Sequence, residues 1–457
     1  MKNKKIIISI SSFVFIIGSV FFLSGCLKEK KTITYKMPLE VWGFVDDSEA
    51  FNEVNKNYKT LAPQIQNIQY RKVSSNAEEF EKELLNAIAS GKGPDIIFFH
   101  NSWLSDHVDK IAPYPQSSQY INKFNKNFID VASADFVKEG EIYAMPLHSD
   151  TLALFYNKDI FNQQAITKAP ATWEELARYT QDLTKIDQNG NFSRSAIALG
   201  RSNNPGGVNR ASDIFTLLLL QNGVEMNEKE RARVGFDKDA KSLQILDFYT
   251  KFAKNSPFYT WNSKMDYSVD SFRFGRTAMM INYSYMANRL KITDPKLNFE
   301  VAPVPQSDLD NKVNYANYWG MAVVKNKVLI PSSPTQKINY TSEDRIKESW
   351  NYIKYVTTGT VINKEGQEIM ATPDPTELYL TATKKPAARK DLIEKQKEDP
   401  ELGVFAVQAL TAKTWKRPKD SFVEPILNEM IDSVVSGKLA AREALEIAVS
   451  RINTLIK

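Results

Sequence analysis

Short apolar runs alternate with helical repeats along most of the chain, which predicts a succession of strands and helices. Residues 39–44 alternate apolar and polar positions and are typical of a strand, whereas residues 96–99 form an apolar run without a polar face. Residues 152–156 predict another buried strand. Strands that are apolar on both sides and alternate with helices indicate an α/β fold with a parallel sheet covered by helices.

The predicted helices are marked by their first turns or by their apolar spacing. Residues 75–78 and 172–175 each match the capping box, in which Ser or Thr is followed three residues later by Glu. The first of these helices is expected to end at Gly91, and the second continues its apolar face to Leu183. A final helix is predicted by apolar residues at positions 441, 444, 445, 448, 452 and 455.

The start of the chain has the pattern of an export signal. Three lysines precede an almost entirely apolar run over residues 6–22, and small residues then lead to Cys26, the sole cysteine of the sequence. Leu-Ser-Gly-Cys at residues 23–26 resembles the bacterial lipobox, in which the cysteine is lipidated. We therefore expect a signal peptide over residues 1–25 and a lipid-anchored tether over residues 26–38, the alternative being an ordinary secretory signal.

Composition limits the functions that the chain can have. Hydrophobic residues make up 42%, aromatic residues 11% and charged residues 25% of the sequence, which is typical of a globular protein. The formal charge of +5 falls to +2 without the three lysines of the signal, so no nucleic-acid partner is expected. About 430 residues remain, enough for two domains. Lipidation of Cys26 would leave no thiol for a disulfide or a cysteine-ligated metal.

A set of motifs follows in order from about residue 39 to the end of the chain. They are Gly-Pro-Asp-Ile-Ile-Phe at 93–98, Tyr-Ala-Met-Pro-Leu at 143–147, Leu-Phe-Tyr-Asn-Lys-Asp at 154–159, Pro-Ala-Thr-Trp-Glu-Glu-Leu at 170–176, Phe-Arg-Phe-Gly-Arg-Thr-Ala-Met-Met-Ile at 272–281, Ala-Pro-Val-Pro at 302–305 and Asn-Tyr-Trp-Gly at 317–320. Their order resembles that of the extracellular solute-binding proteins of ABC importers, in the branch that includes the maltose-binding proteins.

The resemblance implies the two-lobed periplasmic-binding-protein fold, with discontinuous α/β lobes joined by a hinge. We expect residues 39–149 and 321–398 in the first lobe and residues 150–320 and 399–457 in the second. The resemblance also implies a monomeric, extracytoplasmic lipoprotein that binds a carbohydrate between its lobes and delivers it to the transmembrane subunits of the permease. No catalytic residue and no cofactor are implied.

Four candidate ligand residues follow from the motif match. Asp150 stands where the branch places a carboxylate toward the sugar, and a carboxylate can accept from two neighbouring hydroxyls. Tyr285 falls where the branch has a stacking tryptophan. Ser102 and Trp103 lie in a loop that contributes polar contacts in the family, but the charged pair of the maltose binder is missing there, which argues against maltose itself.

Four further tryptophans lie beside predicted loops, at positions 42, 261, 319 and 415. A tryptophan is more often well buried than exposed to a ligand, so each alone is expected in the core. At least two of Trp42, Trp261, Trp319 and Trp415 are nevertheless expected to line the cleft. Trp319, together with the neighbouring Asn317, is the first choice.

Two alternatives stay open at this point. The first is a secreted carbohydrate-active enzyme, because paired carboxylates leave no sequence signature, although no Gly-x-Ser-x-Gly, His-Glu-x-x-His or P-loop motif occurs. The second is the same receptor fold with a peptide, polyol or metal complex as its ligand. A zinc site would need His100, His107 and His148 to converge with nearby acids, and ordinary surface or polar-core positions are the expectation.

Overall fold

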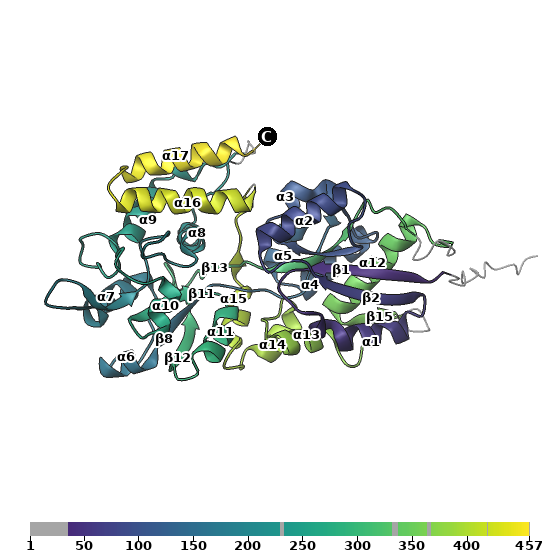
Figure 1. The fold of residues 1–457 in the computed structure, drawn as a ribbon, viewed down its shortest axis with the longest axis horizontal. Coiled ribbons are helices and arrows are strands. Elements are labelled where there is room, and N and C mark those ends of the chain that lie inside the picture. Colours follow the sequence, from purple (N-terminus) through teal and green to yellow (C-terminus); the bar gives the residue numbers. More distant parts are fainter. Residues whose placement is uncertain (1–34, 229–232, 331–336, 363–366, 418, 457) are drawn as a thin grey trace, which may run out of the picture.

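Two helix-covered sheets lie side by side in separate lobes along the long axis of the molecule (Figure 1). The computed structural model describes residues 35–228, 233–330, 337–362, 367–417 and 419–456. The predicted signal peptide and Cys26 lie outside these residues. None of the described helices has the length and apolar character needed to cross a membrane.

The sheet of the first lobe has the order β2–β1–β3–β14–β4, with β7 also paired to β14. β1 runs parallel to β2 and β3, as predicted, but β14 runs antiparallel to its neighbours, so the sheet is mixed. The reason is that β14 enters from the second lobe at the carboxyl end of β3, where Trp319 pairs with His100. The strands are β1 (Met37–Gly43), β2 (Ile65–Lys72), β3 (Ile96–His100), β4 (Ile111–Ala112), β7 (Met145–Pro146) and β14 (Trp319–Val324).

Helices cover this first sheet (Figure 1), and the lobe also contains two small two-stranded ribbons. Every residue of β3 is buried, as expected for a strand covered on both faces. The helices are α1 (Asn52–Leu61), α2 (Ala77–Ala89), α3 (Leu104–His107), α4 (Ser117–Asn127), α5 (Asp130–Phe136), α12 (Ser342–Thr358), α13 (Pro375–Thr383) and α14 (Lys390–Gln396). The ribbons are β5 (Val137–Lys138) with β6 (Glu141–Ile142), and β15 (Thr360–Ile362) with β16 (Glu368–Met370).

The sheet of the second lobe has the order β12–β8–β11–β10–β9. Its predicted strand at residues 152–156 is confirmed as β8, which pairs antiparallel with both β11 and β12. The strands are β8 (Ala153–Asn157), β9 (Lys185–Ile186), β10 (Phe192–Ile197), β11 (Thr277–Asn282) and β12 (Phe299–Pro303). The helices are α6 (Lys158–Gln163), α7 (Trp173–Leu183), α8 (Ala211–Gln221), α9 (Ala240–Lys251), α10 (Ser268–Arg273), α11 (Tyr285–Thr293), α16 (Asp420–Val435) and α17 (Ala441–Thr454).

The first turns of two helices test the predicted caps. α7 begins after Thr172, whose side chain accepts a hydrogen bond from the backbone N–H of Glu175, as predicted. α2 begins one residue later than predicted, because Asn76 rather than Ser75 accepts the N–H groups of the first turn. Asparagine caps a helix as well as serine does, so a Ser-Asn pair leaves two possible starts.

The chain passes between the lobes three times. At each passage its buried apolar residues leave the core of one lobe and join the core of the other. The first core holds buried residues up to Leu147, and the second core begins at Leu152. The chain returns between Tyr315 and Ala316, and it leaves again after Ala412. The short α15 (Gly403–Ala409) and the parallel pair of β13 (Asn314–Tyr315) with β17 (Ala412–Lys413) lie at this junction (Figure 1). The residue bounds predicted for the lobes stay a prediction.

Candidate functional site

The first and second passages meet at Asp150. The backbone N–H of Asn317 donates to the carbonyl of Asp150 at 3.0 Å, which ties the two passing segments together. The carboxylate of Asp150 accepts from the backbone N–H of Thr151 at 2.9 Å and from the hydroxyl of Ser284 at 2.8 Å. Ser284 immediately precedes α11 and also donates its backbone N–H. Asp150 therefore links the crossing to the start of a helix in the second lobe.

Burial dominates the electrostatics of Asp150. Loss of hydration raises the pKa of its carboxyl to about 7, although the hydrogen bonds from Ser284 and Thr151 oppose this shift. The side chain is 9% exposed in this conformation. A carboxylate has about four acceptor positions, and several are used by its own chain. Asp150 thus acts first as a structural acceptor at the junction, and its predicted contact with a ligand stays a prediction.

His100 connects two of the other predicted residues. Its Nε2 lies 2.9 Å from Oδ1 of Asn317, and its Nδ1 lies 2.7 Å from the hydroxyl of Ser102. The amide oxygen of Asn317 can only accept, so Nε2 of a neutral His100 carries the proton and Nδ1 accepts from Ser102. The structure therefore brings Ser102, Asn317 and Asp150 into one polar chain across the passages.

An aromatic cluster packs beside this polar chain. The ring of Trp319 lies 4.4 Å from that of Phe44, 4.9 Å from that of His100 and 5.1 Å from that of Trp103, measured between centroids. Trp319 is 8% exposed and Trp103 6% exposed. Both tryptophans border the junction, but their faces contact other rings. In this conformation they support His100 rather than present a free stacking surface.

Tyr285 is the candidate whose ring is open to solvent. It is the first residue of α11 and is 42% exposed. Its hydroxyl accepts a hydrogen bond from Nη2 of Arg210 at 3.1 Å. Because Ser284 binds Asp150, the ring of Tyr285 is held next to the polar chain of the junction. An exposed aromatic ring beside hydrogen-bonding groups is suited to a ligand with apolar faces and hydroxylated edges.

A buried ionic group at the junction was not predicted from the sequence. Nζ of Lys385 lies 2.6 Å from Oδ1 of Asp46 and 3.0 Å from the hydroxyl of Tyr379, which itself donates to Asp46 at 2.7 Å. Burial lowers the pKa of Lys385, and the charge of Asp46 opposes that change. Burial, aided by the charge of Lys385, holds the pKa of His148 well below its ordinary value. Asp46 follows the predicted strand β1, and this position could have suggested a site residue. No local sequence pattern indicates a role for Lys385.

Three predicted residues lie away from the polar chain of the junction. Trp42 is 6% exposed on β1, where its indole N–H donates to Glu40. Trp261 is fully buried in the second core, and its indole N–H donates to the carbonyl of Gly206. Trp415 is 3% exposed in the same core, although it lies close to the third passage. The structure therefore does not bring these three rings to the polar chain, and a ligand role for them stays a prediction.

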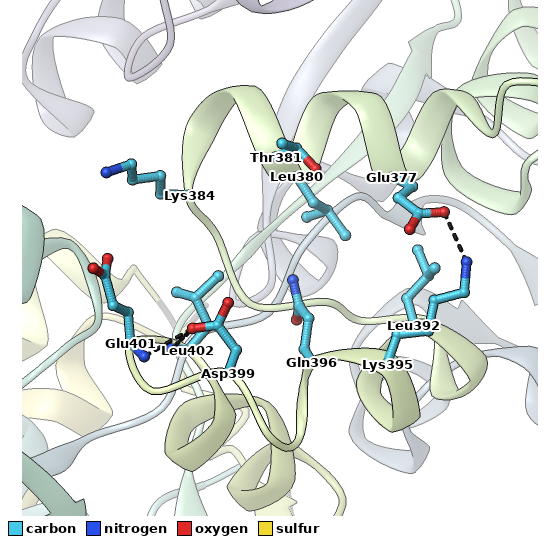
Figure 2. A pocket seen from close by; sticks show the side chains of 10 residues that line it. All are labelled: Glu377, Leu380, Thr381, Lys384, Leu392, Lys395, Gln396, Asp399, Glu401 and Leu402. Atoms are coloured by element: carbon cyan, nitrogen blue, oxygen red, sulfur yellow. Dashed lines mark hydrogen bonds and ion pairs between the residues drawn. The ribbon is translucent and has the colours of Figure 1, made fainter.

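A cavity of about 370 Å³ opens elsewhere, between α13, α14 and residues 399–402. Figure 2 shows the ion pair of Glu377 with Lys395 on one side of it and Lys384 on the other. None of the predicted ligand residues lines it; the lining residues are Glu377, Leu380, Thr381, Lys384, Leu392, Lys395, Gln396, Asp399, Glu401 and Leu402.

A zinc site would need the three histidines to converge with acids in the described part of the chain. No group of three or more His, Cys, Asp or Glu side chains there is placed to hold a metal ion. His107 binds Glu81 through Nε2 at 2.7 Å, whereas His100 binds Asn317 and Ser102.

The chain belongs to the bacterial extracellular solute-binding protein family, whose model matches residues 48–328. The maltodextrin-binding protein MdxE of Bacillus subtilis is 22% identical over 425 residues, which cover 90% of this chain and 89% of MdxE. Relatives from Brucella abortus are 25% identical over 231 residues, and the match spans about half of their length (52%) and 49% of this chain.

Solved structures share the two-lobed fold of this chain. The sugar-binding protein MalE of Xanthomonas citri superposes with a TM-score of 0.70 at 17% identity, covering 92% of this chain and 97% of that one. A cyclo/maltodextrin-binding protein in complex with maltotetraose superposes with a TM-score of 0.67 at 18% identity, with the same coverage of 92% and 97%. The predicted periplasmic-binding-protein fold is therefore confirmed.

Proposed function

We propose that the protein is the extracytoplasmic receptor of an ABC importer, which binds a carbohydrate between its lobes and delivers it to the permease. The observation that carries this proposal is the polar chain from Ser102 through His100, Asn317 and Asp150 to Ser284, with the exposed ring of Tyr285 beside it. A sugar offers an apolar face for the ring and hydroxyls for the polar groups. MdxE, by its name, binds maltodextrin, which supports the same class of ligand.

Binding of a sugar between the lobes changes the shape of the receptor without any chemical reaction. Three passages join the lobes, and a rotation there changes few backbone dihedrals. A ligand that contacts both lobes only when they are closed shifts the population toward the closed form. The permease then distinguishes loaded from empty receptor by shape, and the sugar leaves the site unchanged. We expect the receptor to act as a monomer.

The test is a thermal-shift screen of mono- and oligosaccharides, followed by chromatography of each hit. A ligand that binds only the native state raises the melting temperature, by an amount that grows with its concentration. The proposal predicts hits among carbohydrates, each recovered intact after incubation. Hits confined to peptides, polyols or metal complexes would contradict the ligand class, and cleavage of the sugar would favour the enzyme.

Anchoring through Cys26 is part of the same proposal. Cys26 ends a lipobox-like segment and is separated by ten residues from Met37, where β1 begins. Ten extended residues span at most about 35 Å, so an anchored receptor would stay close to the membrane and its permease. Cys26→Ser should release the protein into the soluble fraction of the producing cells. Membrane retention of this variant through mild washing, at the level of the parent, would overturn the anchor.

A further inference from the structure

Arg210 lies between two aromatic rings beside the proposed sugar site. It precedes α8 with a left-handed backbone (φ 64°), and its guanidinium lies over the rings of Tyr283 at 5.3 Å and Tyr285 at 5.8 Å. Nη2 donates to the hydroxyl of Tyr285 at 3.1 Å. Since Tyr285 follows Ser284, which binds Asp150, the guanidinium is held next to the junction.

No carboxylate in the described part of the chain forms a direct ion pair with Arg210 within 4.0 Å, and Asp213 favours its charged form only from farther away. The nearby carboxylate of Asp213 accepts from the hydroxyl of Tyr283 at 3.0 Å and lies 3.8 Å from Nη2 of Arg417. Among the described residues, Arg210 forms no ion pair within 4.0 Å, and its buried Nε has no hydrogen-bond partner. In spite of its burial, the two tyrosines and Asp213 raise the pKa of Arg210, but none of them accepts a hydrogen bond from Nε.

The acids of the junction are already engaged. Asp46 is bound by Lys385 and Tyr379, and the carboxylate of Asp150 is bound by Ser284. Neither carboxylate is therefore free to neutralise Arg210. A direct ion pair with Arg210 is therefore left open for a group of a bound ligand.

The segment that carries Arg210 is held in place. The backbone N–H of the preceding Asn209 donates to the hydroxyl of Ser268 at 2.8 Å, and its side-chain oxygen accepts from Asn282 at 2.9 Å. Its amide nitrogen also donates to the hydroxyl of Tyr267. These bonds fix the backbone from which Arg210 extends, and the hydrogen bond to Tyr285 orients the guanidinium before a ligand arrives.

We propose that the carbohydrate carries an oxyanion, in the first instance the carboxylate of a uronic acid unit, which pairs with Arg210. This inference rests on the proposed function and deepens it by naming the class of sugar. The carboxylate accepts from the terminal Nη groups of the guanidinium, whose planar fork suits carboxylate geometry. The adjoining sugar ring lies on Tyr285, whose hydroxyl is already oriented by Nη2.

The experiment is isothermal titration of the full chain with matched trisaccharides. The probes are trigalacturonate and trimannuronate, each beside its full methyl ester, which keeps the rings and hydroxyls but removes the charge. A galactose trisaccharide bearing a 6-sulfate ester distinguishes a general oxyanion preference from a carboxylate preference, and binding of either anion supports the inference. Neutral maltotriose and galactotriose complete the set.

Wild-type protein is expected to bind at least one acidic probe about tenfold or more tightly than its neutral partner. This preference should weaken between low and high NaCl, because salt screens a charge pair that is open to solvent. Arg210→Gln should remove the preference, weakening the acidic probes about tenfold more than their neutral partners. Arg276→Gln, at an exposed arginine paired with Asp266, is the matched control and should leave the preference intact.

Two results would overturn the inference. If neutral trisaccharides bind and acidic ones bind no better, the receptor stands but its ligand is uncharged. If Arg210→Gln weakens acidic and neutral sugars equally, Arg210 acts only through the position of Tyr285. Failure of every carbohydrate probe, acidic or neutral, would instead count against the proposed function itself, so the two failures are distinguishable.

Discussion

The carboxylate of Asp150 accepts hydrogen bonds from both the backbone N–H and the hydroxyl of Ser284, at 3.0 and 2.8 Å. The two residues are 134 positions apart in the sequence. Asp150 lies on the first passage between the lobes, and Ser284 precedes the helix that carries Tyr285 at its start. This contact therefore joins the hinge to the ring that is proposed to hold the sugar.

Stability should depend on pH through Asp150. Burial raises its folded-state pKa to about 7, above the ordinary value of 3.8, so the native state holds a proton that the unfolded state releases. This contribution is complete below about pH 4 and is lost as the pH rises through about 7. The free energy of unfolding of the wild type, relative to Asp150→Asn, should fall over that window in urea titrations. Ser284→Ala should move the fall to higher pH because it removes a donor to the ionised form. Parallel profiles of wild type and Asp150→Asn would contradict this prediction.

Tyr285→Ala should weaken sugar binding by about 2 kcal/mol, or roughly thirtyfold, if the ring is a desolvated anchor. Its 42% exposure predicts little change in melting temperature. Tyr285→Phe is the matched control, since it keeps the ring and removes only the hydroxyl that accepts from Arg210. Calorimetry that gives unchanged affinity for Tyr285→Ala would remove this residue from the site.

Substitution of Trp319, in contrast to Tyr285, should reduce stability. Its ring packs against Phe44, His100 and Trp103 and is 8% exposed. Trp319→Ala should therefore cost about 3–5 kcal/mol of folding free energy, and Trp319→Phe less, in denaturant titrations. A stable Trp319→Ala variant with weakened sugar binding would instead show that the ring contacts the ligand directly.

The buried pair of Lys385 and Asp46 should be strongly coupled. Lys385→Met or Asp46→Leu alone leaves one uncompensated buried charge and should destabilise the protein by about 3–5 kcal/mol. The double variant should cost less than the sum of the single variants in a double-mutant cycle. Lys395→Met is the control, because its ion pair with Glu377 is half exposed and should contribute only about 0–1 kcal/mol. Additive losses for the buried pair would show that the two charges do not stabilise one another.

The elements that sequence reasoning predicted best are those whose signal is local. Period-two alternation located β1, the fully apolar run located β3, and the Thr-x-x-Glu motif located the start of α7. The start of α2 was misplaced because Ser75 and Asn76 are both good caps. The antiparallel β14 was missed because strand direction depends on where the chain returns from the other lobe.

The candidate site was predicted less completely because burial and pairing join residues far apart in the sequence. Asn317, Ser102 and Asp150 were named, but their connection through His100 was not. Lys385 lies 339 residues from its partner Asp46, and no local pattern marks such a pair. The sequence does not distinguish tryptophans of the cleft from those of the core, because a large ring beside a loop is found in both places.

Small-angle scattering, with and without a saturating sugar from the thermal-shift screen, tests most directly whether this protein is a receptor that closes on carbohydrate. The account predicts that the radius of gyration falls as the sugar is added and that the sugar is recovered unchanged from the same sample. An unchanged radius of gyration at saturation, or turnover of the sugar, would contradict it.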